Sequence, residues 1–281
     1  MKVTALIENT RAEGSEDLRA EHGLSLYIEH GEKRILFDTG ASGAFADNAA
    51  RLSIAIEAVD MAVISHHHYD HGGGLRRFLQ INQRASIYLR SPPAGDCRFK
   101  FLWMDRYIGL DQALLREHAR RFIFVTERTV ASPDATLLTD VGHSYSLPRS
   151  NRNLYLARGG KLVPDDFAHE LVLVLREGDG LVVFTGCSHR GILNMVEAVT
   201  RAFPGLPMRA VFGGFHLVIL PTLNFMSGSK EEVRGIGTRM LQYPLERVFT
   251  GHCTGSRAFQ VLKGAMGEKL EYIATGRTVT V

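Results

Sequence analysis

Four histidines and an aspartate occupy a single six-residue stretch, from His66 to His71. The stretch follows an apolar, strand-like segment, Val59 to Ile64. Imidazole and carboxylate groups gathered at the end of a strand suit a divalent metal ion, and a packed apolar core avoids them. His66 and His68 are two residues apart, so in an extended segment both side chains point the same way and can share one ion.

The residues that follow allow a second ion to bind beside the first. Three consecutive glycines, Gly72 to Gly74, let the chain turn sharply and bring Asp70 and His71 toward a second position. The alternatives are a surface histidine cluster, a tag-like accident and a single structural zinc site. A tag would lie at a terminus without a preceding strand, and a closed zinc site would use all its ligands on one ion. The pattern therefore favours a dinuclear centre.

His66, His68, Asp70 and His71 spell His-x-His-x-Asp-His, and this motif resembles the signature of the metallo-β-lactamase superfamily. The resemblance implies an α/β fold, the αββα sandwich of two mixed β-sheets flanked by helices. It implies two divalent metal ions per chain, zinc first, with manganese or iron as alternatives, and hydrolysis through a metal-bound hydroxide. Asp70 would bind metal and orient that hydroxide, while Asp38 would support a ligand histidine by accepting its other N–H.

A strand pattern recurs in the two halves of the chain. In each half a hairpin precedes a helix, and a further strand then ends just before a histidine. The expected first-half elements are Leu24 to His30, Arg34 to Phe37, Ala44 to Leu52 and Met61 to Ile64; their second-half counterparts are Leu171 to Arg176, Leu181 to Phe184, Ile192 to Phe203 and Met208 to Phe212. A helix from Arg257 and strands near Tyr272 and Val279 complete the second half. Two such halves predict two sheets face to face.

The chain length and composition indicate one enzyme domain over residues 1–281. Its 281 residues, 45% hydrophobic and 22% charged, can bury a large core. Residues of about 91–165 belong to neither repeat, and we expect an insertion or lid there, with a helix over Asp111 to Arg121. Phe99, Trp103 and Arg106 offer aromatic and cationic surface in this range, although irregularly spaced aromatics more often form a small satellite core.

The charge and the apolar pattern exclude several classes of partner. A net charge of +3 is too small to indicate nucleic-acid binding, although the arginine-rich stretch from Arg116 to Arg121 favours an anionic small-molecule substrate. No apolar run reaches membrane-spanning length, and the first residues resemble a strand rather than a signal peptide, so we expect a cytoplasmic protein without membrane partners. Three widely spaced cysteines indicate no disulfide framework. No pattern indicates an oligomeric state.

The remaining ligands must come from the second half, where the candidates are His169, Cys187, His189, His216 and His252. Cys187 stands where the superfamily places a bridging aspartate; its thiolate could bind metal, or His189 could reach in from the following turn. His169 with Cys187 is a coherent alternative to His189. For the late ligand we favour His252 over His216, and expect His216 to stabilise the leaving oxygen. A packed core histidine is the alternative for each.

Four further segments resemble one branch of the superfamily, the branch that contains dihydropterin-methyl-ribofuranosylaminobenzene-phosphate synthases. The segments are Leu6 to Asn9, Thr185 to Ile192, Gly213 to Leu217 and Gly251 to Gly255. The resemblance extends over nearly the whole chain. This branch implies a phosphorylated or pterin-like substrate. The alternatives are a transferase that condenses a dihydropterin diphosphate with an aryl riboside, a lactone or lactam hydrolase, and a non-catalytic ligand-binding member of the fold.

Overall fold

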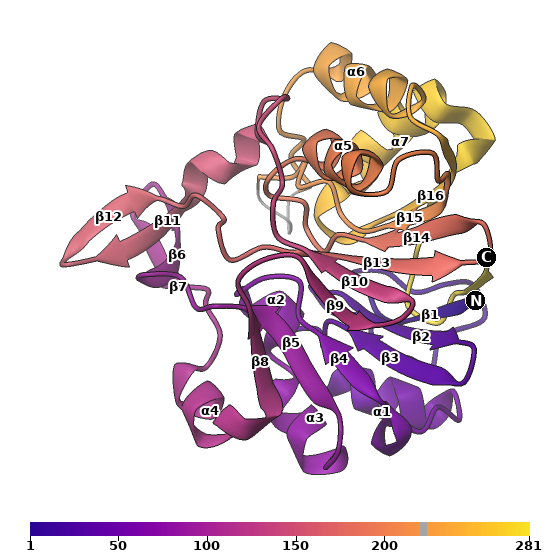
Figure 1. The fold of residues 1–281 in the computed structure, drawn as a ribbon. Helices are drawn as coiled ribbons and strands as arrows, with labels where there is room; N and C mark the ends of the chain where they lie inside the picture. The colour runs from indigo at the N-terminus through magenta and orange to yellow at the C-terminus, as the bar shows by residue number, and fades with distance from the viewer. Residues whose placement is uncertain (220–223) are drawn as a thin grey trace.

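Two seven-stranded β-sheets pack face to face in the computed structural model, which describes residues 1–219 and 224–281 (Figure 1). The strands of the first sheet are β1 Lys2–Ile7, β2 Ser25–His30, β3 Lys33–Phe37, β4 Met61–Val63, β5 Ser86–Arg90, β8 Phe122–Val125 and β18 Thr278–Thr280. The strands of the second are β9 Thr129–Ser132, β10 Ala135–Leu138, β13 Val172–Glu177, β14 Gly180–Phe184, β15 Met208–Phe212, β16 Leu245–Thr250 and β17 Leu270–Tyr272. Both sheets contain parallel and antiparallel pairs, so both are mixed.

Helices cover the two outer faces of the sandwich (Figure 1). The α-helices are α1 Ala44–Arg51, α2 Tyr69–Gly72, α3 Leu75–Ile81, α4 Gln112–Glu117, α5 Ile192–Ala202, α6 Lys230–Met240 and α7 Ser256–Met266. The 3-10 helices are η1 Ile56–Ala58, η2 Ala119–Arg121, η3 Arg149–Asn153, η5 His252–Thr254 and η6 Gly267–Lys269. Apolar side chains of α1, α3 and α4 pack on the first sheet, and those of α5, α6 and α7 pack on the second. The expected αββα architecture is therefore confirmed. None of the described helices is both long and apolar enough to cross a bilayer.

The core between the sheets contains a row of aromatic rings. Phe184 lies 5.6 Å from Phe37 of the first sheet and 5.1 Å from Phe212, and Phe212 lies 4.6 Å from Phe249, measured between ring centroids. All four side chains are fully buried. Because β14, β15 and β16 are parallel neighbours, these rings stack across the inner face of the second sheet and hold the two sheets in register.

A smaller sheet projects from the sandwich (Figure 1). Its strands are β6 Asp96–Phe101, β7 Met104–Tyr107, β11 Leu154–Arg158 and β12 Lys161–Pro164. They all come from the range of about 91–165, in which we expected an insertion or lid. The same range also supplies β8 to the first sheet and β9 and β10 to the second, so part of it belongs to the sandwich. A lid function stays a prediction.

Most elements begin and end within a residue or two of the expected positions, with two exceptions. The strand near Val279 does not complete the second half, because β18 pairs with β1 in the first sheet. The expected helix over Asp111 to Arg121 ends at Glu117 and continues as the short 3-10 helix η2. Asp111 caps α4 by accepting the N–H groups of Ala113 and Leu114.

Replacing a ring of the aromatic row should destabilise the sandwich. Phe184→Ala leaves a cavity between the sheets, so the free energy of unfolding should fall by about 3–5 kcal/mol. Phe124→Ala is the control, because Phe124 of β8 is 41% exposed and its truncation should cost less than about 0.5 kcal/mol. Urea unfolding followed by circular dichroism measures both. Equal losses in the two variants would show that the row does not hold the sheets together.

Candidate metal centre

The candidate ligands follow the carboxyl ends of four strands. His66 follows β4, Cys187 follows β14, His216 follows β15 and His252 follows β16. The second-sheet strands β14, β15 and β16 are parallel neighbours, so their carboxyl ends lie at one edge of that sheet. The end of β4 in the facing sheet meets the same edge. The loops therefore bring residues far apart in the sequence into one buried cluster.

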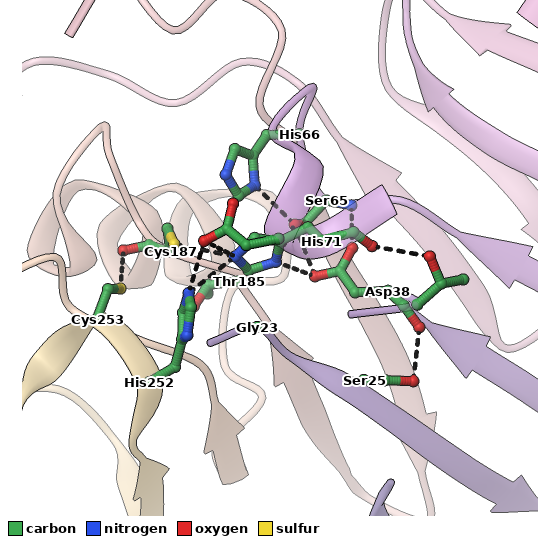
Figure 2. Close-up of polar contacts among 12 residues, drawn as sticks. Gly23, Ser25, Asp38, Ser65, His66, His71, Thr185, Cys187, His252 and Cys253 are labelled. Atoms are coloured by element: carbon green, nitrogen blue, oxygen red, sulfur yellow. Dashed lines mark hydrogen bonds and ion pairs between the residues drawn. The ribbon is translucent and has the colours of Figure 1, made fainter. Parts of the chain in front are cut away.

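Three groups of possible ligand atoms share Cys187, and two of them contain residues of the His66 to His71 motif. In the first group, Asp70, His71, Cys187 and His252 each offer an atom within 4.8 Å of the others. His71 Nε2 lies 3.1 Å from Cys187 Sγ and 3.1 Å from His252 Nε2, and Figure 2 shows these side chains converging. The second group consists of His66, Cys187 and His189. The thiol thus lies at the junction of the two groups.

The spacing within these groups suits a common ion. His66 Nε2 and His189 Nε2 face each other at 3.3 Å. Two nitrogens that each lie about 2.0 Å from a tetrahedral zinc ion are separated by about 3.3 Å. Imidazole, thiolate and carboxylate donors together are also a set that divalent transition metals bind. The residues present therefore fit a metal centre, with His66 and His189 at one position and His71 and His252 at the other.

His68 lies between this centre and another buried group. Its ring centroid is 4.6 Å from that of His66 and 4.8 Å from that of His189. One ligand atom of His68 is also grouped with Cys97, Asp165 and His169. His169 Nε2 bonds to Asp165 Oδ2 at 3.1 Å, and no group in the described chain contains both His169 and Cys187.

His216 lies beside the centre, over the ring of His189. The two ring centroids are 4.1 Å apart, and His216 shares a possible ligand group with Cys187 and Cys253. Within residues 1–219 and 224–281, neither ring nitrogen of His216 has a hydrogen-bond partner, and both atoms are buried. Its backbone has a φ of 49°, which is uncommon for a residue with a Cβ. The ring is thus free to meet an ion or a ligand.

Asp38 holds two loop residues beside the centre. Its Oδ2 lies 2.6 Å from His71 Nδ1, and its carboxylate accepts from the Ser65 N–H at 2.7 Å and the Ser65 hydroxyl at 2.8 Å (Figure 2). Ser65 Oγ lies in turn 2.8 Å from His66 Nδ1. These contacts leave the Nε2 atoms of both histidines directed at the cluster. The contact with His71 is the one that the supporting role expected for Asp38 requires.

Two asparagines orient the histidines of the second half. Asn9 Oδ1 lies 3.0 Å from His252 Nδ1, and Asn151 Oδ1 lies 3.3 Å from His189 Nδ1. An amide oxygen can only accept, so each histidine carries its proton on Nδ1 and presents a bare Nε2 to the cluster. Sequence reasoning missed both asparagines, because a single asparagine in a loop carries no spacing signal.

Burial keeps most of the imidazoles neutral. It lowers the pKa of His66 and His189 well below the ordinary value, and neighbouring histidines lower both further. Burial and the neighbouring His169 lower the pKa of His68 to about 4, and burial lowers that of His252 to about 3. A neutral imidazole keeps the lone pair with which it binds a metal ion.

The pKa values of His71 and Asp70 are shifted in the directions that favour their charged forms, unlike those of the other histidines. Burial alone would lower the pKa of His71, but the carboxylates of Asp38 and Asp70 raise it to about 9. Burial would raise the pKa of Asp70, yet His71, His22 and His252 hold it well below the usual range. Asp70 is thus an ionised carboxylate inside the cluster. Such a charge suits a second metal position next to the neutral imidazoles.

His22 is a further residue that sequence reasoning missed. Its Nε2 lies 3.2 Å from Asp70 Oδ2, and its ring stacks on that of His252 with centroids 4.8 Å apart. It precedes β2, far from both partners in the sequence, so no local pattern marks it. Phe167 is another such residue, since its ring stacks on that of His189 with the centroids 4.6 Å apart.

A pocket of about 660 Å³ opens over the cluster. The side chains of His68, Asp70, Cys187, His189 and His216 line its floor. The small sheet and the loop after β15 supply an apolar wall, made by Phe99, Met104, Ile108, Leu154, Val218 and Ile219. The exposed Arg106 of β7 lies on the same wall and adds a positive charge. The pocket can therefore take a small molecule with an apolar body and an anionic group.

The comparisons with known proteins agree with this architecture. The family model of the metallo-beta-lactamase superfamily matches residues 18–92. The crystal structure of a metal-dependent hydrolase of the beta-lactamase superfamily is 30% identical, with a TM-score of 0.83 over 100% of this chain and 99% of that one. The chain therefore belongs to the metallo-β-lactamase superfamily.

The chain is also similar to a curated protein and to a second solved structure. The 7,8-dihydropterin-6-methyl-4-(beta-D-ribofuranosyl)-aminobenzene-5'-phosphate synthase of Methanocaldococcus jannaschii is 27% identical, covering 92% of this chain and 90% of its own. The Zn(2+)-bound PqqB of Methylobacterium extorquens is 11% identical, with a TM-score of 0.59 over the full length of both chains, and shows the shared fold alone.

The buried imidazoles predict that acid destabilises the metal-free protein. The folded-state pKa values of His68 (about 4), His216 (about 3) and His252 (about 3) lie below the value of about 6.5 in the unfolded chain. The unfolded chain therefore binds more protons, and the free energy of unfolding should fall as the pH drops from about 6.5 to 4. His71 acts oppositely: its raised pKa adds stability that is lost as the pH rises toward 9.

Urea unfolding with excess chelator at pH 5, 6, 7 and 9 measures this dependence. We expect the greatest stability between pH 6 and 7, with a steeper loss on the acid side because several histidines act there together. A free energy of unfolding that is constant or higher at pH 5 would contradict the neutral state of these imidazoles.

Proposed function

We propose that this chain is a dinuclear metal-dependent hydrolase that acts on a phosphorylated or pterin-like small molecule. The observation that carries the proposal is that Cys187 belongs to both groups of ligand atoms that contain residues of the motif. A residue at that junction can serve two ions at once. We assign His66, His68 and His189 to one ion and Asp70, His71 and His252 to the other, as the motif suggested, with the Cys187 thiolate between them.

Zinc is the ion that we expect, because its borderline character suits thiolate and imidazole together. Two bound ions would lower the pKa of a water molecule and polarise the phosphoryl group under attack. The protein has to leave the Nε2 lone pairs of the histidines available and directed at the cluster. It does so by hydrogen bonds to their Nδ1 atoms, which pair His71 with Asp38, His252 with Asn9 and His189 with Asn151.

The remaining chemical steps belong to residues of the pocket. The ionised Asp70 accepts hydrogen bonds and can orient the attacking oxygen. Burial lowers the pKa of His216 to about 3, so its ring is neutral and carries one N–H. That N–H can donate to the leaving oxygen as negative charge develops there. Arg106 at the pocket wall can pair with a distal anionic group of the substrate.

A second candidate function is the condensation of a dihydropterin diphosphate with a phosphorylated aryl riboside. It is supported by 27% identity to the synthase over 92% of the chain. In that reaction the same cationic centre would neutralise the departing diphosphate. Incubation of metal-loaded protein with both substrates, followed by mass spectrometry of the product, separates a joined product from a hydrolysed one.

Metal content tests the proposed ligands. Asp70→Ala should lose about one of two bound metal equivalents, because it removes the carboxylate from one ligand group. His67→Ala is the matched control within the same motif, since His67 Nε2 bonds to the Arg90 carbonyl at 2.7 Å and faces away from the cluster. Elemental mass spectrometry on untagged protein measures both. Two equivalents retained in Asp70→Ala would exclude this assignment.

Turnover tests the substrate class. Metal-loaded protein should cleave an activated nitrophenyl phosphodiester slowly, and a chelator should abolish the reaction. Arg106→Ala should raise KM about tenfold with little change in kcat, as expected for uniform binding of an anion. Arg98→Ala is the control, because Arg98 pairs with Asp105 at 3.4 Å and does not line the pocket. Lactam or lactone hydrolysis without phosphoesterase activity would overturn the proposal.

A further inference from the structure

We infer that two buried glutamates, Glu8 and Glu170, are positioning residues that hold His252 and His189 by their backbones. The inference deepens the proposed metal centre and rests on it. Both glutamate side chains are fully buried, and neither lies among the possible ligand groups. Each instead accepts the backbone N–H of a histidine that we assign to the centre.

Glu170 holds the loop after β14 with both carboxylate oxygens. Its Oε1 accepts the N–H of His189 at 2.8 Å, and its Oε2 accepts the N–H of Arg190 at 2.9 Å. An anchor is of use there, because Ser188 has a left-handed φ of 57° and lies beyond Phe184, the last residue of β14 that pairs with β15. Since Glu170 directly precedes Leu171 and β13, the loop is tied to the edge of the second sheet.

Glu8 holds the loop after β16 in the same way. Its Oε1 accepts the N–H of His252 at 2.5 Å and the hydroxyl of Tyr272 at 2.9 Å. Its Oε2 accepts the N–H of Thr10 at 2.7 Å and the hydroxyl of Thr10 at 2.6 Å. His252 also has a left-handed φ, of 50°. Glu8 follows β1 of the first sheet, so this contact ties the two sheets together at the cluster.

Glu8 and the adjacent Asn9 contact His252 at two places, its backbone and its ring. Glu8 fixes the backbone of His252, and Asn9 receives its ring Nδ1 at 3.0 Å. The space is tight, since a Cβ on Gly251 would lie 2.9 Å from Glu8 Oε1. The backbone position and the ring orientation of His252 are therefore set by two adjacent residues of the loop that follows β1.

The cost of burial argues that these carboxylates serve a specific purpose. Burial raises the pKa of both side chains, although the hydrogen bonds that they accept oppose this shift. A carboxyl group in the interior is unfavourable unless strong hydrogen bonds compensate its burial, and an apolar side chain would fill the same space at a lower cost in free energy. Both carboxyl groups accept their hydrogen bonds mainly from backbone N–H groups of loops and from hydroxyl groups. A ligand-bearing loop held in a strained conformation is where such bonds are of most use, because metal binding depends on ligand position within a few tenths of an ångström.

The test compares Glu170→Gln and Glu8→Gln with wild type in metal affinity. Glutamine keeps the volume but replaces one acceptor oxygen with a donor that faces an N–H, so the loop should shift. We expect each variant to weaken one metal equivalent about 10- to 100-fold, the usual effect of losing a residue that orients a ligand. Glu170→Gln should affect the ion at His66 and His189, and Glu8→Gln the ion at His71 and His252.

Competition with a chromophoric chelator gives the two dissociation constants, and the spectrum of the cobalt-substituted protein reports ligand geometry. Glu232→Gln is the matched control: Glu232 Oε2 also accepts a backbone N–H, that of Ser229 at 2.8 Å, but it caps α6 away from the centre. The control should keep both affinities and the cobalt spectrum. Circular dichroism confirms that each variant is folded under the conditions of the titration.

The outcomes separate this inference from the function on which it rests. Folded glutamine variants with wild-type affinities and spectra would overturn the positioning role and leave the metal centre intact. A wild-type protein that binds no metal would instead overturn the proposed function. Should the glutamine variants not fold, Tyr272→Phe removes one bond from Glu8, and Glu170→Asp withdraws the carboxylate from its loop. These milder variants should weaken the same ion by a smaller factor, and unchanged affinity in both would also overturn the inference.

Discussion

One electrostatic constraint governs this structure: a dense cluster of imidazoles and carboxylates is buried where the edges of two β-sheets meet. Ionised groups inside a protein cost several kcal/mol unless they are paired, so each has to be neutral, paired or bound to an ion. Burial leaves most of the histidines neutral, whereas His71 is paired with Asp38 and Asp70. The loops around the cluster exist in their observed form because they satisfy this requirement.

Glycines at the same edge allow the loops of the cluster to approach one another closely. A Cβ on Gly186, whose φ is 64°, would lie 2.3 Å from Ser65 Oγ, and one on Gly214 would lie 2.3 Å from Cys253 Sγ. Ser65 bonds to both Asp38 and His66, so a side chain at position 186 would disturb the contacts that aim a histidine at the cluster. The close packing of the backbone at Gly186 is therefore needed for the hydrogen bonds that orient the histidine.

The small sheet forms part of the pocket wall beside a cluster that the sandwich builds. Its hairpin of β6 and β7 faces the cluster across the pocket and contributes Phe99, Met104 and Arg106 to the wall. The buried Glu8 and Glu170 hold the loops of the cluster from beneath, whereas Arg106 on this wall is exposed to solvent. Proteins often carry their binding residues on loops and appended elements that a rigid scaffold positions.

The sequence alone determined the hairpins, the αββα class and the convergence of His66, Asp70 and His71, because side-chain direction over a few residues follows from strand and turn geometry. It also limited the second-half ligands to five candidates. Only the tertiary structure decided that β18 joins β1, that Cys187 lies between two ligand groups while His169 lies with Asp165, and that His22, Asn9 and Glu170 surround the cluster. These contacts join segments distant in the chain, and their geometry depends on how two whole sheets pack, which no local spacing encodes.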